Sequence, residues 1–307
     1  MTKVAIDLMG GDNPPEHLLS ALAEWAPTVS PSVELHGIGH PRLKPLTRSP
    51  LFFHSAPESI EMEDPPLLAL RRKKQSSLLI GLRMLKEGVV DAFVSAGNTG
   101  ALVSGAKVIL STFSGIQRPA LLALMPTKQQ PIAVLDVGAN VSATADHLVQ
   151  FAHLGAAYQR ARGIAAPAIG LLNIGSEATK GAPEQKQAYK TLKNLPSFIG
   201  NIEGQSAFEG TVNVLVTDGF TGNVFLKTAE GVLDLLSATP PKHVEFVGAL
   251  LIGVHGLVVK CHGAASPRSF IQTIQGAIGL AEKQFLRRIL QELSNKPIGS
   301  NAETPYA

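Results

Sequence analysis

The chain has 307 residues and a mass of 32.3 kDa, with 45% hydrophobic and only 17% charged residues. This composition excludes intrinsic disorder, and its low charge content indicates elements buried on both faces or a surface that something apolar covers. The net charge of +3 gives little support for a nucleic-acid-binding protein. A single cysteine excludes a disulfide framework and fits a reducing cytosol, so we expect a cytoplasmic protein.

Short aliphatic segments recur from the N-terminus onward and predict β-strands. Most are continuous rather than alternating, as expected for strands that helices cover on both faces. The predicted strands are Val4–Leu8, Val33–Ile38, Leu51–His54, Ala92–Ser95, Ala120–Met125, Ile132–Asp136, Ala168–Asn173, Phe198–Ile202, Val212–Thr217 and Leu257–Cys261.

Helical patterns lie between many of these strands. After Ser142, Thr144 can cap a helix that Gly163 can end. Near the C-terminus, Ser266 and Pro267 form a cap followed by proline, and one apolar face continues to Ile289. The alternation predicts an α/β fold with a doubly wound, mainly parallel sheet.

The chain carries no repeat and no long linker, which predicts a single domain over 1–307 with two lobes at most. Pro41–Pro50 and Ala238–Lys242 are predicted loops, and the polar tail 297–307 is predicted to fray. No signal-peptide pattern precedes Val4. The longest apolar run, Phe246 to Val259, is shorter than the ~20 residues that a membrane-spanning helix needs, so we expect a soluble protein.

Seven predicted strands are followed by turns that combine glycine with a polar residue. Because the carboxyl ends of parallel strands share one edge of a sheet, we expect these turns to line a single rim. They are 9–12, 96–100, 136–140, 173–176, 200–204, 218–223 and 262–263.

Turn chemistry alone explains glycine or asparagine in any one of these turns. Asparagine recurs in five of the seven, however, and its amide can bond an anionic oxygen without burying a cation. Helix N-termini add free N–H groups and partial positive charge. The rim therefore suits phosphate or a developing oxyanion.

Several familiar sites are absent from the sequence. There is no dinucleotide glycine fingerprint, no nucleotide P-loop and no nucleophile elbow. The nine histidines show no metal-ligand spacing. Cys261 and His262 are neighbours on a predicted strand and point to opposite faces, which argues against a catalytic dyad.

Taken in order, these segments closely resemble the phosphate acyltransferase family (PlsX). The resemblance covers nearly the whole chain. Its segments are Asp7–Asp12, Ser59–Met62, Leu70–Lys74 with Ser76 and Ser77, Val94–Ala101, Arg118–Ala120, Asp136–Val141, Leu171–Gly175, Lys180–Gly181, Phe198–Gly204 and Asp218–Asn223.

The resemblance implies an α/β fold like those of isopropylmalate dehydrogenase and phosphotransacetylase. It implies that orthophosphate attacks the thioester of acyl-acyl-carrier-protein, giving acyl phosphate and free carrier protein early in bacterial phospholipid synthesis. It also implies a homodimer that needs no metal or other cofactor. A membrane glycerol-3-phosphate acyltransferase would then take the acyl phosphate.

The matching motifs also suggest site residues. The catalytic candidates are Lys180 as a cation, Asn223 and Asn201 as oxyanion donors, His262 as a proton donor to the leaving sulfur, and Asp7 to orient donors. Candidate substrate-binding residues are Gly10, Gly11, Asp12, Gly97, Asn98, Thr99, Gly100, Asp218, Gly219, Thr221 and Gly222, with Asn98 a third candidate oxyanion donor. Arg71, Arg72, Lys73 and Lys74 are candidate contacts for the acidic carrier protein.

The chain departs from the family at three places. His255 stands where the family usually has asparagine, and Ala264–Ser266 stand where it has Ser-Ser-Asn. The family also carries a few dozen residues, linked to membrane contact and the dimer surface, where this chain has only Ser237–Glu245. We therefore expect weakened peripheral membrane association.

Two other functions fit the sequence. One is a phosphotransacetylase-like transferase that uses a short acyl-coenzyme A. The other is a non-catalytic protein that binds acyl carriers.

Overall fold

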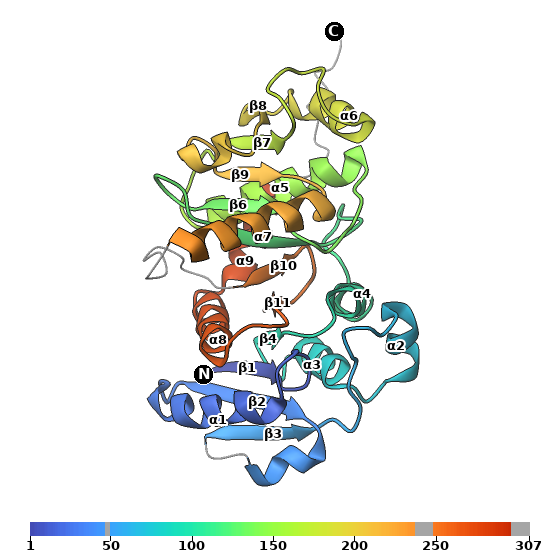
Figure 1. Ribbon diagram of the computed structural model, residues 1–307, viewed down its shortest axis with the longest axis vertical. Helices are drawn as coiled ribbons and strands as arrows, with labels where there is room; N and C mark the ends of the chain where they lie inside the picture. Colours follow the sequence, from blue (N-terminus) through green and yellow to red (C-terminus); the bar gives the residue numbers. More distant parts are fainter. Residues whose placement is uncertain (47–49, 237–247, 296–307) are drawn as a thin grey trace.

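The computed structural model describes residues 1–46, 50–236 and 248–295 (Figure 1). The predicted loop at Ala238–Lys242, the shortened segment Ser237–Glu245 and the tail 297–307 lie outside these ranges. One sheet runs through the described chain, with the strand order β3-β2-β1-β4-β11-β10-β5-β6-β9-β7-β8. The strands are β1 (Thr2–Asp7), β2 (Val33–Gly39), β3 (Leu51–Ser55), β4 (Ala92–Ser95), β5 (Ala120–Met125), β6 (Ile132–Leu135), β7 (Ile169–Leu172), β8 (Phe198–Ile202), β9 (Val214–Val216), β10 (Ala249–Ile252) and β11 (Leu257–Lys260).

Helices cover both faces of this sheet, and side-chain alternation in β1 shows why. Val4 and Ile6 belong to one apolar layer with residues of α1, α5, α6, α8 and α9, whereas Ala5 belongs to the other with residues of α2, α3, α4 and α7. Both faces are buried, as the continuous apolar segments predict. The helices are α1 (Pro15–Trp25), α2 (Pro66–Arg72), α3 (Ser77–Lys86), α4 (Thr99–Leu110), α5 (Ala145–Ala161), α6 (Pro183–Leu192), α7 (Gly219–Leu236), α8 (Pro267–Glu282) and α9 (Phe285–Asn295).

All ten predicted strands are present, and the structure adds β10. Its residues lie in the apolar run from Phe246 to Val259, where the sequence analysis recognised only the second half as a strand. β10 pairs antiparallel with both β11 and β5 and is fully buried. β10 runs opposite to both of its neighbours, so β5 has the same direction as β11.

The two helix patterns have different outcomes. The helix after Ser142 is confirmed as α5, with the Thr144 side chain accepting from His147 N–H in a capping box. The pattern from Pro267 to Ile289 is not continuous, because Gln284 has a φ of 48° and separates α8 from α9. Apolar spacing continued across this break, which hid it in the sequence. Within the predicted loop Pro41–Pro50, residues Pro41–Leu46 form a 3-10 helix.

The expectation that seven turns share one rim is wrong. β5 is antiparallel to β6, and β6 is parallel to β9, which is parallel to β7, itself parallel to β8. These four strands therefore run opposite to β1, β4 and β11 along the sheet. The turns after β1, β4 and β11 form one set, and those after β6, β7, β8 and β9 form a second set at the other edge.

Candidate functional site

The turns after β1 and β4 pack backbone against backbone. A Cβ added to Gly10 would lie 2.6 Å from the backbone nitrogen of Gly97, so glycine is required for this approach. Asp7, at the end of β1, is buried and accepts hydrogen bonds from Ser95 Oγ at 2.8 Å and Met9 N–H at 3.0 Å. Ser95 Oγ accepts in turn from Gly97 N–H at 3.0 Å. Asp7 thus holds the glycine turn through Ser95, and its role in orienting donors for catalysis stays a prediction.

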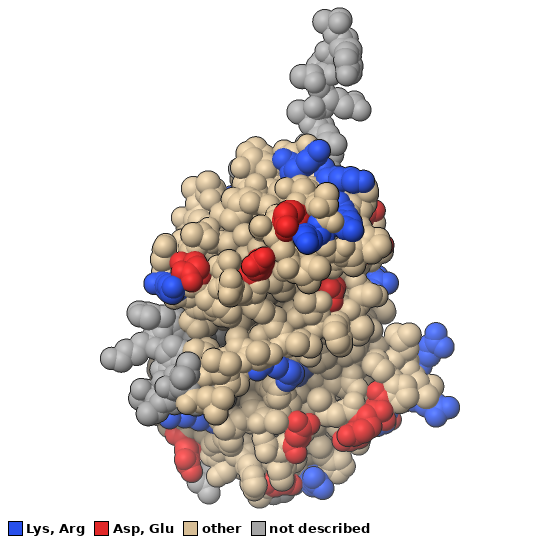
Figure 2. All heavy atoms as spheres, turned by 45° about the horizontal axis from the view of Figure 1, so that its top comes forward, with Lys and Arg blue, Asp and Glu red and all other residues tan. Residues whose placement is uncertain are grey.

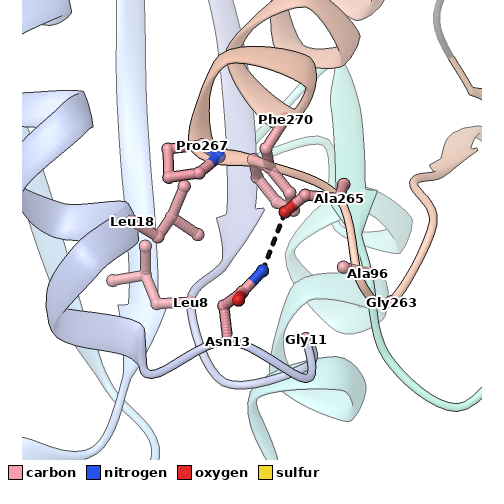
Figure 3. Close-up of a pocket in the computed structure, with 9 residues that line it drawn as sticks. All are labelled: Leu8, Gly11, Asn13, Leu18, Ala96, Gly263, Ala265, Pro267 and Phe270. Atoms are coloured by element: carbon pink, nitrogen blue, oxygen red, sulfur yellow. Dashed lines mark hydrogen bonds between the residues drawn. The ribbon is translucent and has the colours of Figure 1, made fainter.

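The turn after β11 is tied to the same place. Asp12 N–H donates to the Gly263 carbonyl at 2.9 Å, and the Asn13 amide donates to the Ala265 carbonyl at 2.9 Å. Figure 3 shows this second bond beside a small apolar cavity of about 30 Å³, which has room for one or two waters. Its lining residues are Leu8, Gly11, Asn13, Leu18, Ala96, Gly263, Ala265, Pro267 and Phe270.

A buried lysine lies beneath these three turns. Lys260, the last residue of β11, donates from Nζ to the Ala96 carbonyl at 3.0 Å and also to the Cys261 carbonyl. Burial lowers the pKa of Lys260 to about 8, against the opposing effect of Cys261, Asp12 and Asp7. Burial raises the pKa of Asp7, against its hydrogen bonds to serine hydroxyls. The turns therefore surround an ionisable pair of opposite sign.

His262, two residues after this lysine, points toward α7. Its Nε2 lies 2.6 Å from Nζ of Lys227, an exposed residue in the middle of α7. Burial lowers the pKa of His262, and the charges of Lys227 and Lys260 lower it further. Polar atoms from β11 and α7 thus meet at one surface.

The second set of turns is organised by a buried carboxylate. Asp136, after β6, accepts from the backbone N–H groups of Leu121, Gly138, Ala139 and Asn140 and from the Asn140 amide. Burial raises the pKa of Asp136 against these bonds. Its role is to hold the turn 137–140 in place.

The α7 N-terminus packs tightly on the turn 137–140. A Cβ added to Gly222 would lie 1.9 Å from the Asp136 carbonyl oxygen, and Gly219 N–H donates to the Asn140 carbonyl at 2.8 Å. Asp218 caps the helix by accepting from Thr221 N–H and its hydroxyl, both at 2.9 Å. The predicted motif 218–223 is therefore a rigid helix start.

Helix α7 joins the two sets of turns. Asn223 and Lys227 are four residues apart and share one face of the helix, about 6 Å apart along its axis. Asn223 lies beside Gly138 of the β6 turn, and Lys227 contacts His262 of the β11 turn. Figure 1 shows α7 crossing the sheet from the β9 side toward β10.

A larger cavity lies on the opposite side of α7. Its volume is about 510 Å³, within the range of small-molecule sites. Its lining is mainly apolar: Leu172, Asn173, Ile174, Gly181, Ala182, Gln185, Thr221, Val224, Phe225 and Thr228. Thr221 is therefore the predicted substrate-binding residue that faces this space.

Lys180 and Asn201 belong to this cavity's side of the molecule. The Asn173 amide donates to the Lys180 carbonyl at 3.1 Å, and the Lys180 ammonium, about half exposed, lies 3.9 Å from Glu177. The Asn201 amide donates to the Glu177 carbonyl at 2.8 Å, while its buried Oδ1 has no partner within the described ranges. The structure thus places Lys180 and Asn223 on different sides of α7.

Asn98 has a structural role that the sequence analysis did not foresee. Its Oδ1 caps α4 by accepting from Ala101 N–H at 3.0 Å. Its amide nitrogen is directed at the carbonyls of Glu61, Met62 and Asp64, at 2.9 to 3.3 Å. Asn98 is therefore not a free oxyanion donor; it ties the loop before α2 to the start of α4, which Thr99 and Gly100 begin.

The basic residues at the end of α2 lie mostly on the surface. Arg71, Arg72 and Lys74 are exposed, whereas Lys73 is 2.5 Å from the Asp64 carboxylate. The ion pair with Lys73 lowers the pKa of Asp64. Figure 2 shows a surface that is mainly uncharged, with Lys and Arg gathered near α6 and on the lobe that carries α2. A carrier-protein contact at Arg71–Lys74 stays a prediction.

Two of the family departures have simple structural accounts. His255 is in the hairpin between β10 and β11, at the far end of β11 from His262, and packs edge-on against Phe113 with 5.1 Å between ring centroids. Ser266 caps α8, with its Oγ accepting from Ser269 N–H at 3.2 Å. His255 is therefore remote from the surface between α7 and the β11 turn, whereas Ala264 belongs to that turn and its N–H contacts His262 Nδ1.

Comparison with known sequences decides the family. Residues 2–244 match the model of a family described as "Fatty acid synthesis protein". A phosphate acyltransferase from Chlamydia caviae is 40% identical over 316 residues, covering 95% of this chain and 99% of the relative. Another from Thermotoga maritima is 40% identical over 321 residues, with 95% of each chain covered. The chain belongs to the phosphate acyltransferase family.

Membership of this family makes the protein an acyltransferase. The two aligned stretches are longer than 307 residues, so both relatives carry residues for which this phosphate acyltransferase family member has no counterpart. No helix within the described ranges could span a membrane.

Solved structures confirm the fold class. A phosphotransacetylase from Streptococcus pyogenes has a TM-score of 0.65 at 19% identity, covering 92% of this chain and 94% of its own. An isocitrate dehydrogenase from Methylococcus capsulatus has a TM-score of 0.51 at 12% identity, with 95% and 89% covered. At these identities the likeness shows the fold alone.

Sequence reasoning missed two residues of this site. Lys260 stands inside an otherwise apolar strand, and a lysine there signals a buried, paired cation. Lys227 is four residues after Asn223, a spacing that places the two side chains on the same face of a helix. Both signals were present in the sequence, but the sequence analysis took only glycine-containing turns as evidence of a site.

Proposed function

We propose that this protein transfers an acyl group from acyl-acyl-carrier-protein to orthophosphate, releasing acyl phosphate and free carrier protein. The observation that carries the proposal is the position of α7, which brings Asn223 and Lys227 on one helical face to the turns after β6 and β11. This surface combines the exposed Lys227, an amide and tightly packed glycine turns, with the buried Lys260 beneath the turns. Such donors suit an anionic nucleophile and an anionic intermediate.

The reaction needs positioning and charge stabilisation rather than a covalent enzyme intermediate. A phosphate oxygen forms a bond to the thioester carbon, the carbonyl oxygen becomes an oxyanion, and the carbon–sulfur bond then breaks. Asn223 is the donor for the oxyanion, and Lys227 and Lys260 supply positive charge. The leaving thiol has an ordinary pKa of ~8.5, so it requires little help from a general acid.

The finer assignments from sequence continue as parts of this proposal. We place the protein in the cytoplasm as a homodimer that passes acyl phosphate to a membrane glycerol-3-phosphate acyltransferase. Because the chain lacks residues that relatives carry, we expect it to co-sediment with phospholipid vesicles less than those relatives do. Equal co-sedimentation would overturn that expectation.

One assay tests the proposed reaction. Long-chain acyl-acyl-carrier-protein, long-chain acyl-coenzyme A and acetyl-coenzyme A are each incubated with the protein, with and without phosphate, and acyl phosphate is trapped with hydroxylamine. We expect a product from the long-chain acyl carrier that depends on phosphate. A product from acetyl-coenzyme A alone would indicate a phosphotransacetylase, and carrier binding without product would indicate a binding protein.

A further inference from the structure

The His262 ring lies between two hydrogen-bond donors. Ala264 N–H donates to Nδ1 at 3.2 Å, which leaves the ring proton on Nε2. That nitrogen lies 2.6 Å from Lys227 Nζ. An ammonium group has donors only, so Nε2–H and the lysine place hydrogen against hydrogen with no acceptor between them.

The charges around this contact are mainly positive. Lys227, Lys260 and Asp12 are the charged groups that face His262. Lys260 is buried and directed at the carbonyls of Ala96 and Cys261, and it also faces Asp7. Asp12 is exposed, and its backbone N–H is bonded to the Gly263 carbonyl. Two lysines thus outnumber the one exposed carboxylate, and the Nε2–H group of His262 is a third hydrogen-bond donor beside them.

We propose that a phosphate oxygen binds between Lys227 Nζ and His262 Nε2, accepting a hydrogen bond from each. The flexible lysine stem lets Nζ move away to admit the oxygen. The need for an acceptor follows from the two opposed donors, the positive charges beside them favour an anionic one, and its identity as phosphate rests on the proposed function. His262 then contacts phosphate instead of giving a proton to sulfur. Asn223, one turn away on α7, lies on the side where the attacked carbonyl would be.

Binding of inorganic phosphate tests this site without any turnover. The His262 pKa is measured by NMR of the full chain, with His262→Asn to assign the signal and exposed His17 as the internal reference. Phosphate should raise the His262 pKa by about one unit, since an anion in contact favours the charged ring. The His17 signal should not respond to phosphate. If the His262 pKa also stays unchanged at phosphate concentrations that saturate the rate, the proposal is wrong.

Kinetics of Lys227 variants identify the source of the phosphate group. Lys227→Met should raise the KM for orthophosphate on the order of tenfold, the loss expected for one charge-assisted hydrogen bond. Lys227→Arg should keep the KM for orthophosphate close to the wild-type value. Lys86→Met, at the exposed end of α3, should leave this KM unchanged. A raised KM for acyl-acyl-carrier-protein instead would assign the site to the phosphodiester of the carrier's prosthetic arm.

Unchanged KM values for both substrates in a folded Lys227→Met protein would overturn the proposal. If the wild type makes no acyl phosphate at all, the proposed function fails, and the NMR titration still decides whether this contact binds phosphate.

Discussion

At the scale of single residues, Asn223 and Lys180 are the predicted catalytic groups, and the structure separates them across α7. The Asn223 amide makes no hydrogen bond to any described residue, so it is available to a substrate. Replacing Asn223 by Ala should lower turnover of acyl-acyl-carrier-protein at least tenfold, as loss of an oxyanion donor does. Lys180→Ala tests separately the cation role that the family resemblance implies for Lys180, and it should likewise lower turnover at least tenfold. Each rate is measured on protein whose thermal unfolding matches the wild type, and an unchanged rate would remove that residue from the mechanism.

The lowered pKa of Lys260 makes the stability of the folded protein depend on pH in a direction that can be predicted. Its pKa is about 8 in the folded protein and 10.5 as an ordinary lysine, so between these values the unfolded chain binds more protons. Stability from this residue should therefore rise as pH increases from 8 to 10.5. Below pH 8, Lys260 is charged in both states and contributes no slope.

The neighbouring Cys261 has a raised pKa and contributes the opposite slope above its ordinary value of 9.0. Comparison with Lys260→Met isolates the lysine. The unfolding midpoint in urea should rise for the wild type relative to Lys260→Met across this range. A difference that stays constant with pH would show that Lys260 is not held at a lowered pKa.

At the scale of elements, α7 contains two glycines in very different surroundings. A Cβ at Gly222 would meet the Asp136 carbonyl, whereas a Cβ at Gly231 would meet nothing within 4 Å. Gly222→Ala should destabilise the protein by about 1–3 kcal/mol or more, as overpacking does. Gly231→Ala should stabilise it by roughly 0.5–1 kcal/mol through helix propensity. Urea unfolding of both variants checks the pair, and equal effects would contradict this placement of the helix.

The sequence predicted the elements well and their directions poorly. Apolar runs identify strands because burial on both faces requires them, and the ten predicted strands are present. Direction depends on which strands pair, and the antiparallel pair of β5 with β6 reverses β6, β9, β7 and β8 relative to β1, β4 and β11. The division of the glycine-containing turns into two sets was therefore not predicted. The role of Asn98 depends on the loop 61–64, which no local pattern connects to it.

At the scale of the whole molecule, two features account for the low charge content. The sheet is covered on both faces, so its strands need no charged residues. Helix α7 also carries large apolar side chains on its surface, including Phe220, Val224, Val232 and Leu235, of which Leu235 is 87% exposed. Exposed apolar residues aligned along one helix are typical of a surface that another molecule covers.

The expected homodimer can be used to test whether the exposed apolar side chains of α7 form an interface. We expect the protein to sediment at about twice its chain mass of 32.3 kDa, with α7 in the interface. Leu235→Lys should then raise the dimer dissociation constant at least tenfold, because a lysine ammonium is costly to bury without a partner. Val108→Lys is the matched control, since Val108 is similarly exposed, on α4. A dimer that Leu235→Lys leaves intact would place the interface elsewhere, and a monomer at every concentration would remove the homodimer from the proposal.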